Sequence, residues 1–132
     1  MFLQYYVTES TTGNRVNIEI DAATKADLDA TRNGWQTVWN TDFILDPQKE
    51  KYAAKTEEGE IIALGAYRVR KGSVAVYIAY IESQPESNPT LVEHKKYSGI
   101  GKAMIAFGIQ LSIDASCNGV VVFEAKTDDL EQ

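Results

Sequence analysis

The feature that most constrains the fold is a mostly apolar stretch without proline, from Gly101 to Ser116. Residues 109–114 alternate as a strand would, so the period alone leaves a strand open. The whole stretch is too long for a typical strand, however, and its length favours a helix covered on more than one side. Gly108 is the weak point, because glycine costs about 1 kcal/mol relative to alanine in a helix interior. Two adjacent helical faces carry the apolar residues Met104, Phe107, Leu111 and Ala115, and Ile105, Ile109 and Ile113.

The residues after this stretch predict a strand that returns to the same sheet. Asn118-Gly119 is a helix stop, and Val120–Phe123 is an apolar run typical of a buried strand. Because a helical crossover joins strands that run in the same direction, we expect Val120–Phe123 to lie parallel to the strand before the helix.

Three segments before the helix predict an antiparallel meander. They are rich in β-branched and aromatic residues, and Glu58-Gly59 and Lys71-Gly72 between them are hairpin turns. Gly65 in the middle segment predicts a bulge. The segments are Tyr52–Glu57, Glu60–Arg70 and Ser73–Glu82.

The first third of the chain predicts two strands and two helices. Phe2–Thr8 and Arg15–Ile20 read as strands around a Gly-Asn turn. Thr24, with Asp27 three residues later, is a capping box for a helix that stops near Gly34. Residues 35–45 read as a second short helix, which Asp46-Pro47 ends. We therefore expect one domain over residues 1–132 of the α/β (α+β) class, a mixed sheet with an antiparallel meander and one β-α-β crossover.

Composition excludes several classes of function. The net charge of −6 argues against nucleic acid as a partner and mildly favours a cationic one, such as an amine. The apolar run Val74–Ile81 is far shorter than the roughly 20 residues of a membrane span. Met1–Thr8 lacks the apolar core of a secretory signal. Cys117 is the only cysteine and His94 the only histidine, so we expect a cytoplasmic protein without disulfide or metal site.

A glycine-containing turn opens the predicted helix. Free N–H groups and a partial positive charge at a helix N-terminus bind phosphate, and glycines let the backbone approach a ligand closely. Gly99-Ile100-Gly101-Lys102 meets both needs. The dinucleotide-binding fingerprint fails because position 104 is Met, and a P-loop fails because Ala103 follows Lys102. A glycine turn that merely starts a helix remains the alternative.

With its surroundings, this turn resembles the Arg/Gln-x-x-Gly-x-Gly/Ala motif of GNAT N-acetyltransferases. The matching residues are Lys96, Tyr97, Ser98, Gly99, Ile100 and Gly101, with lysine at the first position. The resemblance extends over about Tyr52–Thr127 and before that is only topological. It implies that backbone N–H groups of residues 97–102, Lys102 included, hold the pyrophosphate of acetyl-CoA. It also implies that Ile81, Glu82 and Ser83 pair with the pantetheine arm, in a V-shaped gap facing residues 120–124.

The activity that this resemblance implies is acetyl transfer from acetyl-CoA to the primary amine of a small molecule or peptide. Glu82, at the end of its strand, is the candidate base, and Glu124 on the neighbouring strand is the second candidate. A strand-end carboxylate without catalytic role is the alternative. Family members continue with a catalytic Tyr, a helix and two strands. Here the chain stops at Gln132, so we expect a C-terminally truncated or reduced version of the fold.

Other readings remain open. His94 either relays protons or is solvated, and Trp35 and Trp39 either pack in the core or line an acceptor cleft. Tyr77 and Tyr80 are expected on opposite faces of their strand. The chain is alternatively a non-catalytic CoA-binding module, or an interaction domain whose open sheet edge is completed by a partner or by a second copy in a homodimer.

Overall fold

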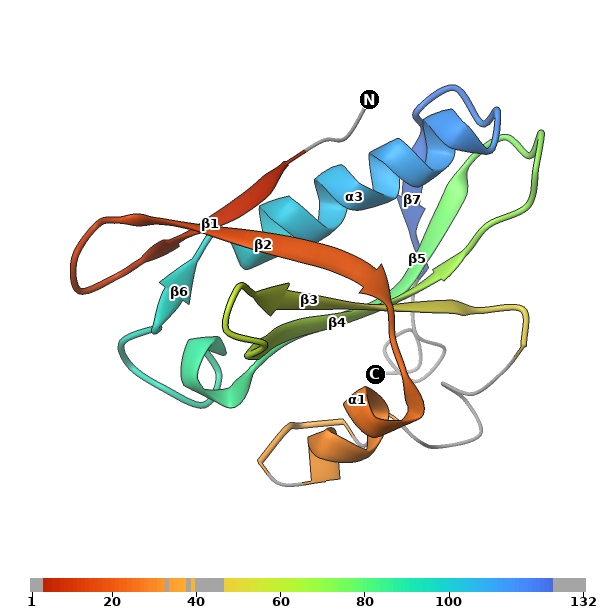
Figure 1. Cartoon of the computed structure of the whole chain (residues 1–132). Helices are drawn as coiled ribbons and strands as arrows, with labels where there is room; N and C mark the ends of the chain where they lie inside the picture. Colours follow the sequence, from red (N-terminus) through yellow and green to blue (C-terminus); the bar gives the residue numbers. More distant parts are fainter. Residues whose placement is uncertain (1–3, 33, 38, 40–46, 125–132) are drawn as a thin grey trace.

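The computed structural model describes residues 4–32, 34–37, 39 and 47–124. They form an α+β fold around a curled seven-stranded sheet with few helices (Figure 1). The strand order is β6-β1-β2-β3-β4-β5-β7, and only β5 and β7 pair in parallel. The elements are β1 (Tyr5–Glu9), β2 (Arg15–Ala22), α1 (Lys25–Asp29), η1 (Ala30–Arg32), β3 (Glu50–Thr56), β4 (Ile61–Arg68), β5 (Val76–Ser83), η2 (Pro85–Ser87), β6 (Tyr97–Ser98), α3 (Ile100–Asp114) and β7 (Val121–Phe123).

The β5-α3-β7 crossover forms as the sequence predicts. Helix α3 packs along one face of the sheet, against β1, β4, β5 and β7, while α1 lies on the other side (Figure 1). Gly108 allows this close approach, because a Cβ there would lie 3.2 Å from Cε1 of Tyr67 and 3.4 Å from Cδ1 of Ile78. The Tyr67 hydroxyl donates to the Met104 carbonyl at 2.8 Å, which fixes the helix on β4.

The antiparallel meander is also confirmed, but its bulges are not where glycine suggests. The ladder shifts between Ala54 and Lys55, and between Ala66 and Tyr67, whereas Gly65 stays in register with its partners on both sides. A Cβ at Gly65 would lie 2.7 Å from Cε2 of Tyr67 and 2.9 Å from Cε of Met104. Glycine is therefore required there by close packing under α3 and not by a bulge.

Strand β7 differs from the prediction in its burial. It is parallel to β5 as expected, yet Val122 and Phe123 are 42% and 58% exposed. A buried strand was expected from its apolar composition, but in the described chain β7 is an outer strand of the sheet, with β5 as its paired neighbour. An edge strand can bury only the side chains that face the helix, as Val121 does.

The first helix begins at its predicted cap and ends early. The Thr24 hydroxyl accepts from the Asp27 N–H, and the Asp27 carboxylate accepts from the Thr24 N–H, which completes the capping box. After η1, residues 34–37 and 39 adopt turns and bends, so this part of the predicted second helix is not helical. The rest of that prediction, residues 38 and 40–45, lies outside the described residues.

Among the helices that the structure describes, none is long and apolar enough to cross a membrane.

Candidate functional site

The turn that opens α3 is held by the far edge of the sheet. Tyr97 and Ser98 form β6 and pair with Glu9 and Thr8 of β1. Gly99 then adopts φ +87°, a left-handed conformation that side chains disfavour, and α3 begins at the next residue. The sheet therefore fixes the direction in which the first turn of α3 points.

The N-terminus of α3 is open. No side chain among the described residues caps it, and the first N–H bonded within the helix is that of Ala103, which donates to the Gly99 carbonyl. The N–H groups of residues 100–102 precede this bond and are left for a ligand or water. A Cβ at Gly101 would meet nothing within 4 Å, so no protein contact explains its glycine.

Glu60, which sequence reasoning missed, anchors the start of this turn. Its carboxylate binds Nζ of Lys96 at 2.9 Å, the Tyr97 hydroxyl at 3.0 Å and Nε2 of Gln84 at 2.9 Å. The charge of Lys96 is thus directed at Glu60. Nothing near Glu60 in the sequence predicts this, because its partners are 24 to 37 residues away.

Glu60 and Lys96 each stabilise the charged form of the other. Burial alone would raise the pKa of Glu60, but the hydrogen bonds from Gln84, Lys96 and Tyr97 and the charge of Lys96 hold it below its usual value. The hydrogen bond to Glu60 in turn raises the pKa of Lys96. Both groups therefore stay charged at neutral pH.

A cavity of about 620 Å³ lies beside the turn. One wall is β1 with its Tyr5 and Tyr6, and the other includes Ser98, Gly99 and Lys102. Lys102, unlike Lys96, has no ion-pair partner within the described ranges. A cation, open backbone N–H groups and aromatic rings therefore surround one hollow.

Strands β5 and β7 part at a bulge in β5. They pair through Ile78 and Phe123, and the last hydrogen bond between them in the described part of the chain runs from the Glu124 N–H to the Ile78 carbonyl at 3.0 Å. The bulge at Ala79 follows immediately, since Tyr67 pairs with Ile78 and Ala66 with Tyr80. Ile81, Glu82 and Ser83 pair with β4 on one side, and no described strand pairs with them on the other.

Glu82 is buried, 4% exposed, and its carboxylate accepts three hydrogen bonds. Its carboxylate accepts the N–H of Gln36 at 2.6 Å, the N–H of Thr37 at 3.2 Å and the indole N–H of Trp39 at 2.9 Å. These bonds fasten the segment after η1 to the end of β5. Three of the roughly four lone-pair sites of the carboxylate are thereby used, and its burial separates it from a substrate ammonium group.

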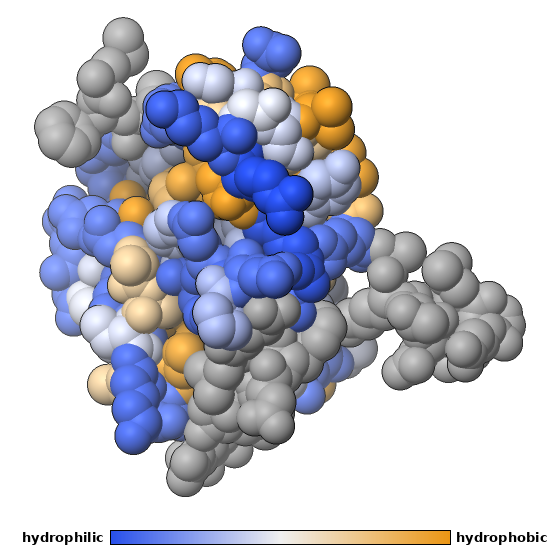
Figure 2. Space-filling view, turned by 90° about the vertical axis from the view of Figure 1, so that its right-hand side faces the viewer, coloured by the Kyte–Doolittle hydropathy of each residue, from blue (hydrophilic) through white to orange (hydrophobic). Residues whose placement is uncertain are grey.

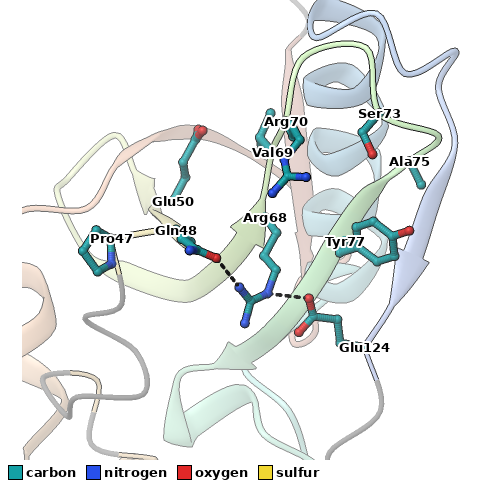
Figure 3. Close-up of a pocket in the computed structure, with 10 residues that line it drawn as sticks. All are labelled: Pro47, Gln48, Glu50, Arg68, Val69, Arg70, Ser73, Ala75, Tyr77 and Glu124. Carbon is teal, nitrogen blue, oxygen red and sulfur yellow. Dashed lines mark hydrogen bonds and ion pairs between the residues drawn. The ribbon is translucent and has the colours of Figure 1, made fainter.

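Glu124 lies in a second cavity, of about 600 Å³, on the sheet face opposite α3 (Figure 3). Nε of Arg68 binds Oε1 of Glu124 at 2.6 Å, and the same guanidinium donates to Oε1 of Gln48 at 3.4 Å. Arg70 and Tyr77 also line this cavity. Sequence reasoning missed both arginines, although two arginines two positions apart in a strand are expected to share a face.

Tyr77 and Tyr80 lie on the same face, contrary to the prediction. Tyr77 lines the cavity with Arg68, and Tyr80 packs edge-on against Trp39 on the α1 side of the sheet. The bulge at Ala79 explains the difference, because the extra residue shifts the alternation of side chains by one position.

The remaining candidates are mostly structural. Trp39 is fully buried and Trp35 packs against the same cluster, which confirms core packing for this pair. Cys117 is buried, and its thiol contacts the Arg70 carbonyl. His94 is exposed in the loop before β6. Within the described parts of the chain, no group of three or more His, Cys, Asp or Glu residues could hold a metal ion.

The sequence matches no protein-family model, and no curated protein matches it significantly.

Proposed function

We propose that this chain is an N-acetyltransferase with a GNAT-like acyl-CoA N-acyltransferase fold, which transfers the acetyl group of acetyl-CoA to a primary amine. One observation carries the proposal. The N-terminus of α3 has no side-chain cap, and Gly101 in its first turn faces open space. Because no protein contact requires glycine at this position, the space beside it is available to a ligand. Such a terminus suits a pyrophosphate, which accepts hydrogen bonds from successive backbone N–H groups.

The neighbouring elements fit the other parts of the same molecule. The cavity beside Gly99, Lys102 and Tyr5 has the size and the groups to take an adenine nucleotide. The free side of Ile81–Ser83 offers strand-edge N–H and carbonyl groups to the amide-bearing pantetheine arm. The described pairing of β5 with β7 ends next to Ala79, and the thioester end would lie near this point.

Acetyl-CoA would supply the thioester, whose C–S bond breaks as the new C–N bond forms. The chain must remove a proton from the substrate ammonium before that attack. Glu124, at the parting of β5 and β7, is better placed for this than Glu82, whose carboxylate already accepts three hydrogen bonds. We therefore assign the proton acceptor to Glu124, directly or through a water molecule, and an anchoring role to Glu82.

The test is direct binding of acetyl-CoA by isothermal titration calorimetry, with Gly101→Ala as the variant. The added methyl meets no protein atom, so the fold should persist, but it would occupy the space where a phosphate approaches the backbone. We expect at least tenfold weaker binding. Gln110→Ala, about two and a half turns further along α3, is the control and should bind like the parent chain.

Absence of acetyl-CoA binding to the parent chain would contradict any role for CoA. If Gly101→Ala and Gln110→Ala bind equally well, the turn is not the pyrophosphate site. Release of CoA thiol in the presence of an amine panel then separates an enzyme from a module that only binds CoA.

A second candidate, an interaction domain, is favoured by the exposed apolar residues of α3 and β7. Ile109, Ile113, Val120, Val122 and Phe123 are between 38% and 58% exposed. Figure 2, which looks from the side where β5 and β7 lie in Figure 1, shows hydrophobic surface beside hydrophilic side chains. An outer strand of this composition can pair with a partner or with a second copy of the chain.

A further inference from the structure

The cavity around Arg68 and Arg70 carries charges of both signs (Figure 3). Of the two acidic residues that line it, Glu124 is paired with Arg68, whereas the Glu50 carboxylate points away and accepts from the Tyr52 hydroxyl at 2.5 Å. Within the described residues, the Arg70 guanidinium has no ion-pair partner. Both guanidinium groups extend from the end of β4 on the same side of the sheet (Figure 3).

This distribution of charge selects among classes of ligand. An anion such as phosphate would be attracted to Arg70 but repelled by Glu124. A simple cationic amine would be attracted to Glu124 but repelled by Arg70. A ligand that carries a carboxylate and an ammonium group can satisfy both, because the planar guanidinium of arginine binds a carboxylate through two hydrogen bonds.

We propose that this cavity binds a small zwitterion of the amino-acid type, with its carboxylate on Arg70 and its ammonium group toward Glu124. The cavity of about 600 Å³ falls within the roughly 300–1,000 Å³ of small-molecule sites. Ala75, Val69 and the ring of Tyr77 supply apolar walls for the body of such a ligand. The proposal rests on the proposed function in one respect, since it makes this zwitterion the acetyl acceptor.

The position of Glu124 connects the cavity to the acetyl-transfer site. Among the described residues, its N–H makes the last bond to β5, just after the end of β7, and its side chain reaches back to Arg68 in the cavity. An ammonium group bound at Glu124 would therefore lie at the parting of the two strands, where the thioester end is expected. Arg70, beyond the end of β4, would hold the other end of the ligand.

The experiment measures ligand binding without CoA, by saturation-transfer NMR with the full chain. The probes are the proteinogenic amino acids and, for each one that binds, its analogues without the carboxylate and without the amine; for phenylalanine these are phenethylamine and 3-phenylpropionate. Acetate and inorganic phosphate test for a plain anion site. We expect at least one amino acid to bind, and its analogues lacking either charge to bind at least tenfold more weakly.

The matched variants are Arg70→Gln and Lys71→Gln. The structure gives the Arg70 side chain no hydrogen bond or ion pair in the described chain, so its replacement should leave the fold intact. Lys71 is exposed, carries the same charge and does not line the cavity. We expect Arg70→Gln to weaken amino-acid binding at least tenfold and Lys71→Gln to leave it unchanged.

The proposal is overturned if no amino acid binds, if phosphate, acetate or a singly charged analogue binds as well, or if both variants behave alike. Acetyl-CoA binding, measured on the same sample, separates the two proposals. Amino-acid binding without acetyl-CoA binding supports this ligand class and sinks the transferase. The reverse result sinks the zwitterion and leaves the transferase standing.

Discussion

At the scale of single residues, buried hydrogen bonds determine which residues of the candidate site can be replaced without destabilising the fold. Glu82 receives two backbone N–H groups and one indole N–H from residues 36–39, far away in the sequence. A carboxylate that accepts from backbone N–H groups fixes a segment that otherwise has no regular structure. This contact positions Gln36, Thr37 and Trp39 against the end of β5.

Glu82→Gln should therefore destabilise the protein. The amide keeps one acceptor but turns an N–H₂ group toward donors, leaving at least one buried donor unsatisfied. The free energy of unfolding should fall by about 2 kcal/mol, measured by urea denaturation. Glu86→Gln, at an exposed carboxylate three residues after the end of β5, should change it little. An unaltered stability in Glu82→Gln would show that the three bonds do not hold the segment.

Gly65→Ala tests the close packing under α3. The new methyl would lie 2.7 Å from the Tyr67 ring, whose hydroxyl is already bonded to α3. Overpacking of this kind costs typically about 1–3 kcal/mol. Gly101→Ala adds the same methyl in open space and should cost far less. Differential scanning calorimetry compares the two, and equal melting temperatures would refute the packing argument.

Some of these roles were readable from the sequence and others were not. The turn at Gly99 could be predicted because it depends on adjacent residues: a glycine directly before an apolar helical stretch. The contact of Glu60 with Lys96 could not, because it depends on how two distant turns meet in space. Nor could the shared face of Tyr77 and Tyr80, since the bulge that causes it lies at Ala79, a residue with no sequence signal.

At the scale of elements, the Glu60 cluster ties the β3–β4 hairpin to the loop between β5 and β6. A carboxyl whose pKa is lower in the folded state stabilises the fold above its unfolded pKa and loses that contribution as pH falls through its folded pKa. For Glu60 the loss therefore begins near its ordinary value of 4.5 and continues below it. Asp27, which binds Lys55 at 2.9 Å, shifts in the same direction.

Glu60→Gln should accordingly flatten the acid limb of the stability profile. The free energy of unfolding, measured with urea from about pH 6 to pH 3, should decline less steeply in the variant than in the parent chain. Glu57→Gln, exposed on the same hairpin, should retain the parent slope. Parallel profiles for Glu60→Gln and the parent chain would mean that Glu60 is not linked to folding.

The elements themselves were largely predictable. Periodicity and turn residues located the meander, the crossover helix and both N-terminal strands to within a few residues. The exposure of β7 could not be predicted, because an apolar run does not show whether a further strand covers it. Secondary structure depends on local pattern, whereas exposure depends on the position of a strand in the sheet.

At the scale of the whole molecule, the outer strand β7 exposes apolar side chains next to α3. Exposed apolar edges promote association between molecules. Val122→Lys should reduce concentration-dependent association, because a lysine on the edge opposes strand pairing. Sedimentation velocity over a range of concentrations measures this. Glu19→Lys, which makes an exposed residue on β2 cationic, is the control for charge, and an equal effect of both variants would argue against the edge.

The bulge at Ala79 also determines which changes in length β5 can tolerate. Downstream of Ala79 the side chains are in opposite phase to those upstream. Removing that one residue would restore the strict alternation of a regular strand. Ile81, which packs toward α3, and Glu82, which faces Trp39, would keep their sides of the sheet, because only the extra residue is lost. A single-residue deletion after the bulge, such as that of Tyr80, would instead act as a frameshift in three dimensions, exchanging inside for outside along the rest of the strand.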